Sequence, residues 1–329
     1  MKILIPPSKS ANILATIAIG EAYFAPFMKY SYPTWDEYCR RHDLGLIVFE
    51  EHLIKQSNRN WKNPYWQKFL VGKYLEKSNL QIRNVCCLDT DILISRLAPD
   101  IFNSYDESKI GLISKRVGLP FEHQSILKRV AYLRNQFYIP EYPLDSSLFI
   151  SLNDLYGSLS LPVQNNEACS GVFLFNIENH SQRLSEFFLS YGKNVMKLDN
   201  GGEQTFLNYF VQSNELQQWL DYRFQALWVY EMACHYPFLY NESQDDLSLI
   251  ATCIESSLFT NHFLHFAGGW FESNMWKQVE IYEQNSSNKF LESFGEYLKR
   301  EVEGTALGQI RPETLVPDQS GADPQIVIL

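Results

Sequence analysis

Short runs of apolar residues recur along the chain, separated by polar segments. The runs lie at 13–20 (ILATIAIG), 44–50 (LGLIVFE), 83–94 (RNVCCLDTDILI), 110–114 (IGLIS) and 170–177 (SGVFLFNI). Within each run apolar and polar residues do not alternate, which is typical of strands buried on both faces of a sheet. The sequence therefore predicts five buried strands, and the third carries a pair of aspartates.

Segments with helical signals lie between these strands and after the last of them. NPYWQKFLVGKYL predicts a helix with Asn63 as its cap and Pro64 at its first position. A second helix is predicted to begin after Gly201 and Gly202. The alternation of strand and helix predicts an α/β fold whose sheet is flanked by helices. Ligands in such sheets bind beyond the carboxyl ends of the strands.

Two regions break this pattern. Residues 116–166 are rich in Tyr, Pro and Ser and are predicted to be irregular, either an insertion or a segment on the acceptor side of a site. From residue 304 the chain has Pro, Gly and no periodicity, which predicts a flexible tail over 304–329. The prediction is one catalytic domain over 1–303, followed by this tail.

Composition narrows the class of protein. The chain is 45% hydrophobic and 15% aromatic, with a net charge of −10 and no basic block, which disfavours nucleic acid and anionic lipid as partners. No apolar run approaches the roughly 20 residues of a membrane span. Six cysteines without CxxC spacing are expected to be reduced, which predicts a cytoplasmic protein. The N-terminal 25 residues loosely resemble a signal peptide, but two prolines and Glu21 argue against that interpretation.

The stretch VCCLDTDILI places two carboxylates in an apolar context. Four interpretations compete: a solvated strand end, a phosphatase of the haloacid dehalogenase type, a calcium loop, and a divalent cation bound to a diphosphate. The phosphatase motif lies on the first strand and has Thr or Val where Leu93 stands. A calcium loop requires further oxygen ligands where Ile92 and Ile94 stand. A solvated strand end and a diphosphate-bound cation stay open, because Mg²⁺ and Mn²⁺ accept both carboxylate and phosphate oxygen.

Three further segments follow CLDTDILI in order: ACSGVFLFN (168–176), GGEQTFLN (201–208) and FLHFAGG (263–269). This succession resembles the GT-A nucleotide-sugar glycosyltransferases. Within them it resembles the retaining glycosyltransferase family 8, the glycogenin and lipopolysaccharide galactosyltransferase group. The resemblance spans about residues 13 to 277. It implies a GT-A mixed sheet flanked by helices and an enzyme that transfers a sugar.

The resemblance also implies roles for individual residues. Asp89 and Asp91 match the metal-binding DxD, and His265 matches the third protein ligand to Mn²⁺ or Mg²⁺. A histidine between two apolar residues is otherwise a core residue. Gln204 matches the residue beside the reacting sugar carbon, and Glu203 occupies the position of the family's Asp.

The same resemblance places the donor nucleotide beyond the first strand. Gly20 would permit close approach of the backbone to the ligand, and Tyr23 would stack on a uracil-like ring. Lys68 lies where the family often has a basic residue near the donor sugar or diphosphate. Tyr23 could equally be a tyrosine that packs in the core, and Lys68 could equally be a solvated surface lysine. The remaining donor-binding candidates are Ala18, Thr90, Gly171, Gly268 and Lys277.

The sequence departs from the family pattern at several positions. Cys169 stands where the family usually has Asn, Glu203 replaces a shorter Asp, and the late Lys-Pro-Trp is absent, with Trp276-Lys277 reversed and displaced. Two other function classes therefore stay open. One is a sugar-1-phosphate nucleotidyltransferase, although its Gly-rich loop after the first strand is missing. The other is a non-catalytic carbohydrate-binding protein with a GT-A-like fold.

The prediction is a metal-dependent glycosyltransferase that moves a sugar from a nucleoside diphosphate, UDP above all, to a hydroxyl of a glycan or another acceptor. Analogy favours a retaining reaction. An inverting enzyme would need a carboxylate base, for which Glu203 is the candidate. The sequence identifies neither the sugar nor the acceptor nor the oligomeric state.

Overall fold

The computed structural model describes residues 1–137, 148–198, 202–241 and 243–278. The chain divides into a compact unit, Met1–Tyr282, and a second unit, Glu283–Leu329. The second unit lies outside the described residues, and so does the predicted tail at 304–329. The first unit is described below.

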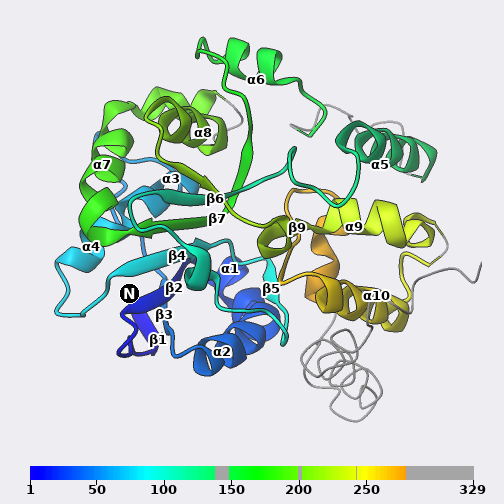
Figure 1. Ribbon diagram of the computed structural model, residues 1–329, viewed down its shortest axis with the longest axis horizontal. Helices are drawn as coiled ribbons and strands as arrows, with labels where there is room; N and C mark the ends of the chain where they lie inside the picture. Colours follow the sequence, from blue (N-terminus) through cyan, green and yellow to red (C-terminus); the bar gives the residue numbers. More distant parts are fainter. Residues whose placement is uncertain (138–147, 199–201, 242, 279–329) are drawn as a thin grey trace, which may run out of the picture. The chain divides into compact units, whose positions relative to one another are not determined.

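A seven-stranded mixed sheet organises the first unit (Figure 1). Strand β2 runs parallel to both β3 and β4, whereas β7 runs antiparallel to β4 and β6. The order is β1 (Lys2–Ile5), β3 (Gly45–Phe49), β2 (Asn12–Ile17), β4 (Asn84–Leu88), β7 (Ala168–Asn176), β6 (Ile110–Ser114) and β8 (Gln217–Trp219). This mixed sheet flanked by helices confirms the predicted fold class.

The inner strands form at the apolar runs, but the end of β2 and both edge strands differ from the prediction. Strand β2 ends at Ile17, because the backbone turns at Gly20, whose φ is +83°. Edge strands β1 and β8 were not predicted from the sequence. Their residues are exposed or half-buried, so they lack the uninterrupted apolar character of the inner strands.

The predicted third strand, 83–94, is wrong as a single strand. Strand β4 ends at Leu88, and β5 (Ile92–Ile94) belongs to a second sheet of order β5-β10-β9, with β10 (Phe263–His265) and β9 (Ala226–Leu227). Three successive polar residues cannot continue through a buried layer, so the chain leaves the first sheet at Asp89 and enters the second after Asp91. The aspartates therefore lie in the turn that joins the two sheets.

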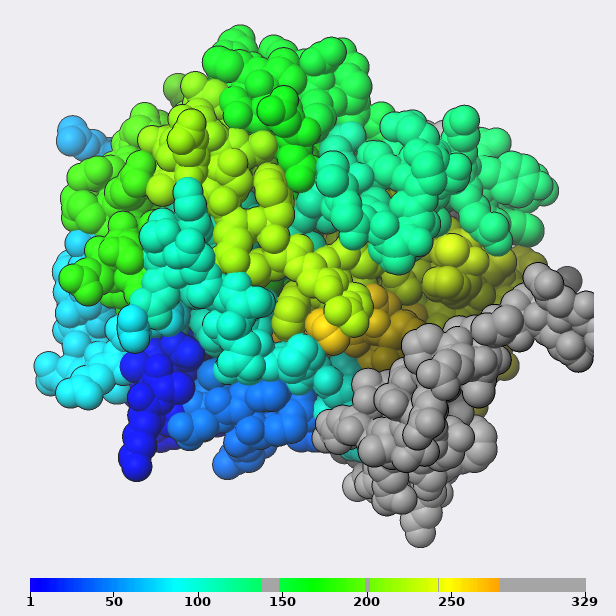
Figure 2. All heavy atoms as spheres, viewed as in Figure 1, coloured from blue at the N-terminus to red at the C-terminus, as the bar shows by residue number. Residues whose placement is uncertain are grey.

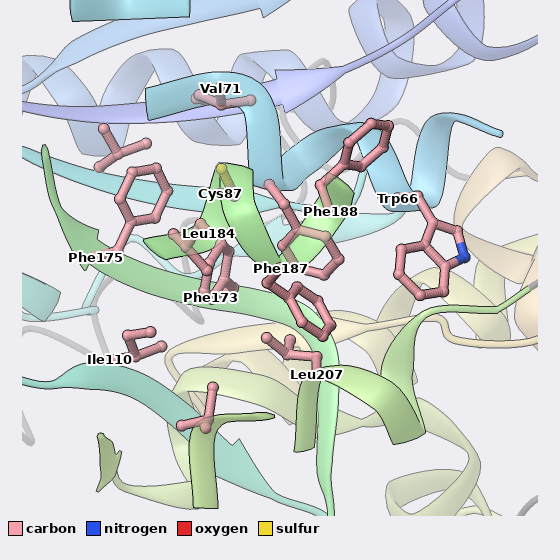
Figure 3. Packing of buried hydrophobic residues seen from close by; sticks show 14 of the residues in the cluster. Trp66, Val71, Cys87, Ile110, Phe173, Phe175, Leu184, Phe187, Phe188 and Leu207 are labelled. Atoms are coloured by element: carbon pink, nitrogen blue, oxygen red, sulfur yellow. The ribbon is translucent and has the colours of Figure 1, made fainter. Parts of the chain in front are cut away.

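Helices cover both faces of the main sheet. On one face the side chains of β2, β4 and β7 pack against α4 (Val71–Glu76) and α7 (Ile177–Ser190) in an aromatic core (Figure 3). In this core the ring of Phe69 lies 5.9 Å from that of Phe173, and Trp66 stacks on Phe187 at 5.9 Å. Each such buried side chain contributes roughly 1.5–3 kcal/mol.

The other face of the sheet packs against α2 (Tyr32–Arg41). Adjacent residues of a strand point to opposite faces, and accordingly Cys86 lies in the α2 core and Cys87 in the aromatic core. The remaining α-helices of the described residues are α1 (Glu21–Pro26), α3 (Pro64–Gln67), α5 (His123–Phe137), α6 (Leu152–Ser158), α8 (Gln204–Ser213), α9 (Trp228–His235) and α10 (Leu247–Thr260).

The segment predicted to be irregular, 116–166, contains helices α5 and α6, so that prediction is wrong in part. Helix α5 buries apolar residues spaced three and four apart, from Ile126 to Leu133, in a core shared with α9 and α10. The Tyr, Pro and Ser content of the whole segment obscured this short periodic stretch. In the space-filling view α5, coloured teal, and α6, coloured green, lie in the upper part of the visible face (Figure 2).

Within the part of the chain that the structure describes, no helix is both long and apolar enough to span a lipid bilayer.

Candidate metal and donor site

The turn between the two sheets brings three predicted metal ligands together. Strand β10 pairs antiparallel with β5, so that His265 lies opposite Ile92. The Nε2 atom of His265 lies 3.3 Å from Asp91 Oδ1 and 3.9 Å from Asp89 Oδ2. One ligand atom from each of the three residues can be chosen so that all lie within 4.8 Å of one another. This is close enough for a single cation to bridge them.

The chemistry of these donors fits a divalent cation. Two carboxylates and one imidazole suit Mn²⁺, and the carboxylates alone suit Mg²⁺. The other ring nitrogen of His265, Nδ1, faces the amide of Gln225 at 3.0 Å and Cys169 Sγ at 3.7 Å. The nitrogen that faces the carboxylates is therefore Nε2, which is available as a ligand.

Neighbouring charges and burial shift the pKa values of His265 and Asp89. Burial alone would lower the pKa of His265, but Cys169 and Asp91 raise it well above its usual value. Desolvation raises the pKa of Asp89, while Lys68 acts in the opposite direction and Asp91 raises it further. Two carboxylates held this close attract a cation.

Lys68 is buried rather than solvated. Its side chain is 7% exposed, and its Nζ lies 2.9 Å from Glu203 Oε1 and 3.4 Å from Asp89 Oδ1. It also donates to the carbonyl of Ser170 at 2.9 Å, and Ser170 Oγ donates to Glu203 Oε1 at 2.6 Å. Burial alone would lower the pKa of Lys68, but Asp89 and Glu203 raise it. Lys68 thus joins the metal-ligand cluster to the start of α8.

Glu203 and Gln204 lie at the N-terminus of α8, as predicted: Glu203 is the N-cap and Gln204 is the first helical residue. Gln204 Nε2 donates to Glu167 Oε1 at 2.9 Å. Glu167 is fully buried and forms ion pairs with Lys115 at 2.6 Å and Arg116 at 2.8 Å. This buried ionic cluster was not predicted, because an isolated glutamate carries no motif in the sequence.

A cavity of about 310 Å³ opens beside the aspartates. Among the predicted site residues, those that line it are Tyr23, Lys68, Asp89, Thr90, Asp91 and Lys277. Polar and aromatic lining residues that the sequence did not single out for a site are Thr16, Tyr65, Ser273 and Trp276. The cavity thus combines acidic, basic and aromatic groups, which suits a nucleotide.

The other predicted donor-binding residues do not line this cavity. Ala18 is fully buried, and its N–H donates to the carbonyl of Phe49, so its side chain belongs to the core. Gly171 packs against His265: a Cβ at this position would collide with Cε1 of the imidazole ring. Gly20 and Gly268 both adopt positive φ. The donor-binding roles that the resemblance implies for Ala18, Gly20, Gly171 and Gly268 therefore stay predictions.

Comparison with known proteins gives matches in structure alone. No protein-family model matches the chain, and no curated protein matches its sequence. A glycosyltransferase involved in glycosylation of the major capsid of PBCV-1 aligns with 81% of this chain and 100% of its own, at 9% identity and a TM-score of 0.45. The bifunctional glycosyltransferase WbbM aligns with 90% of this chain and 53% of its own, at 11% identity and a TM-score of 0.44. The galactosyltransferase LgtC, solved with donor and acceptor sugar analogs, aligns with 86% of this chain and 99% of its own, at 10% identity and a TM-score of 0.42.

These similar structures are glycosyltransferases. That is also the class which the sequence motifs resemble.

Proposed function

We propose that this chain is a metal-dependent GT-A glycosyltransferase that transfers a sugar from a nucleoside diphosphate, preferably UDP, to an acceptor hydroxyl. The observation that carries the proposal is the convergence of Asp89, Asp91 and His265 beside a cavity of about 310 Å³. A carboxylate pair at a solvated strand end would have no reason to meet a histidine that is 2% exposed.

The cavity supplies groups suited to each part of a nucleotide. Asp89, Asp91 and His265 would hold Mn²⁺ or Mg²⁺, which offsets the negative charge of a leaving diphosphate. Lys277 lines the same cavity and would contact a phosphate oxygen. The ring of Tyr23, which is 57% exposed at the cavity, would offer a face to the base.

The surroundings of Glu203 favour a retaining reaction over an inverting one. An inverting enzyme needs a carboxylate that is free to take the acceptor proton. Glu203 is 3% exposed, and its Oε1 is already bound by Lys68 and Ser170. A carboxylate held in this way is not free to reach the acceptor hydroxyl. In the retaining alternative a leaving phosphate oxygen takes the acceptor proton on the same face of the sugar.

The proposal is tested by incubating the chain with a panel of nucleotide sugars and Mn²⁺, without acceptor, and measuring the released nucleoside diphosphate. We expect release from a UDP-sugar that stops when the metal is chelated. Asp91→Asn should slow release about 30-fold or more, which corresponds to about 2 kcal/mol of lost charge stabilisation. Asp106→Asn is the matched control, because Asp106 is an exposed acid that binds Ser108 and does not line the cavity.

Two outcomes would refute the proposal. If Asp91→Asn released the nucleoside diphosphate as fast as the wild-type chain, the metal site would play no part in the reaction. Tight binding of UDP with no release from any sugar, even with acceptor glycans added, would instead support the non-catalytic carbohydrate-binding alternative.

A further inference from the structure

We propose that Gln225 is a positioning residue that holds His265 in the tautomer required of a metal ligand. Gln225 ends the 3-10 turn Tyr222–Gln225, directly before β9, and is 1% exposed. No motif of the sequence marks it. The inference rests on the proposed metal site and concerns how the chain prepares one of its ligands.

The amide of Gln225 fills an irregularity in the main sheet. The register of β7 with β6 shifts between the pairs Cys169–Ile113 and Phe173–Leu112, and the residues of β7 in between do not pair with β6. One atom of the Gln225 amide lies 3.2 Å from the backbone nitrogen of Gly171 and 3.1 Å from that of Val172. The other lies 3.0 Å from the carbonyl oxygen of Cys169.

The orientation of this amide follows from the groups around it. The backbone N–H groups of Gly171 and Val172 can only donate, so the atom that faces them is the amide oxygen. The carbonyl of Cys169 can only accept, so the atom that faces it is the amide nitrogen. The oxygen also lies 3.0 Å from Nδ1 of His265. Nδ1 must therefore carry a hydrogen.

The hydrogen on Nδ1 determines the state of Nε2, the ring nitrogen of His265 that faces the carboxylates. With a hydrogen fixed on Nδ1, a neutral His265 has its lone pair on Nε2, the nitrogen 3.3 Å from Asp91 Oδ1. Metal-ligating histidines usually donate their second ring N–H to such an acceptor, and losing it typically costs 10- to 100-fold in metal affinity. Cys169 Sγ, 3.7 Å from Nδ1, is a weak acceptor and a poor substitute.

The test compares two substitutions of similar size. Gln225→Met keeps the volume and removes the acceptor, whereas Gln225→Glu keeps the acceptor and removes the donor to Cys169. We expect calorimetric titration of the full chain with Mn²⁺, in the presence of UDP, to show 10- to 100-fold weaker binding for Gln225→Met. Gln225→Glu should stay within about 3-fold of the wild-type chain or bind more tightly. Gln218→Met is the control, since Gln218 binds Ser104 and Asp106 at the sheet edge.

A spectroscopic readout tests the tautomer directly. In the wild-type chain labelled with ¹⁵N-histidine and loaded with UDP and diamagnetic Zn²⁺, which accepts both imidazole and carboxylate ligands, the resonance that disappears in His265→Gln should show a protonated Nδ1. This measurement needs no Gln225 variant, so it decides the matter even if Gln225→Met does not fold. A hydrogen on Nε2 of His265 would overturn the inference.

The remaining outcomes separate this inference from the proposed function. If the wild-type chain binds neither Mn²⁺ nor Mg²⁺ with UDP, both fail. If it binds the metal and Gln225→Met binds equally well, the inference alone fails. Equal losses in Gln225→Met and Gln225→Glu would also overturn it, because they would show that Gln225 acts only as packing.

Discussion

Replacing Lys68 with methionine removes a buried positive charge while keeping most of the volume of the side chain. The Nζ of Lys68 lies 2.9 Å from Glu203 Oε1, and the two side chains are 7% and 4% exposed. In Lys68→Met, Glu203 would keep only the Ser170 hydroxyl among these partners. Removing one partner of a buried ion pair leaves the other charge uncompensated, which typically costs 3–5 kcal/mol. We expect the free energy of unfolding to fall by about 3 kcal/mol, since Asp89 is partly solvated and loses less.

Urea denaturation at neutral pH measures this change, and a double variant isolates its cause. In Lys68→Met/Glu203→Gln no unpaired charge remains at position 203, and the amide oxygen can still accept from Ser170. We expect the double variant to recover to within about 1 kcal/mol of the wild-type chain. The control is Lys73→Met, because the pair between Lys73 and Glu76 is about one-third exposed and is expected to contribute less than 1 kcal/mol.

The electrostatic reasoning would be refuted if Lys68→Met unfolded with a free energy within about 1 kcal/mol of the wild-type value. It would also be refuted if the double variant were as unstable as the single one, because the loss of stability would then come from packing and not from the unpaired charge of Glu203.

Three further predictions follow from other contacts. Gly171→Ala should lower Mn²⁺ affinity at least 10-fold and cost about 1–3 kcal/mol of unfolding free energy, because the new Cβ would collide with His265. The control is Gly157→Ala, which should be neutral or stabilising because Gly157 faces open space. Equal Mn²⁺ affinities of Gly171→Ala and the wild-type chain would contradict this prediction. Burial lowers the pKa of Lys62 to about 8 from its usual 10.5, so between these pH values the unfolded chain binds a proton that the folded chain has released. The unfolding free energy of the wild-type chain relative to Lys62→Met should therefore rise with pH by up to about 3 kcal/mol across this range, and a flat or falling difference in urea denaturation would contradict it. Tyr65 is 52% exposed and lines the cavity, where its ring would stack on the base. Tyr65→Ala should therefore lower UDP affinity by about 1–2 kcal/mol in calorimetry. The control is Tyr132→Ala, on the exposed face of α5, and an equal loss of UDP affinity in the two variants would contradict the stacking role.

The inner strands could be predicted from the sequence because burial on both faces leaves an uninterrupted apolar run. The assignment of strands to sheets could not be predicted in the same way. Ile92 and Ile94 read as a continuation of β4, yet they pair with β10, which lies about 170 residues further along the chain. The order of motifs nevertheless singled out three residues that lie close together in the structure, Asp89, Asp91 and His265, because that order carries information that periodicity lacks.

The surroundings of these residues left no signal in the sequence. Gln225 and Glu167 are isolated polar residues whose roles depend on a register shift in β7 and on ion pairs with a distant segment. The sequence predicts Lys68 equally well as a solvated residue or as part of the site, and only its burial against Glu203 in the structure excludes the solvated alternative. Second-layer contacts of this kind depend on tertiary packing, which a local pattern does not encode.

The central claim is that Asp89, Asp91 and His265 hold one divalent cation against a diphosphate. Anomalous diffraction from crystals grown with Mn²⁺ and UDP tests it most directly. The account predicts a single manganese peak within about 2.0–2.3 Å of an oxygen of each aspartate and of Nε2 of His265, with diphosphate oxygens completing the coordination. UDP bound in the cavity with no manganese peak at these three residues would contradict it.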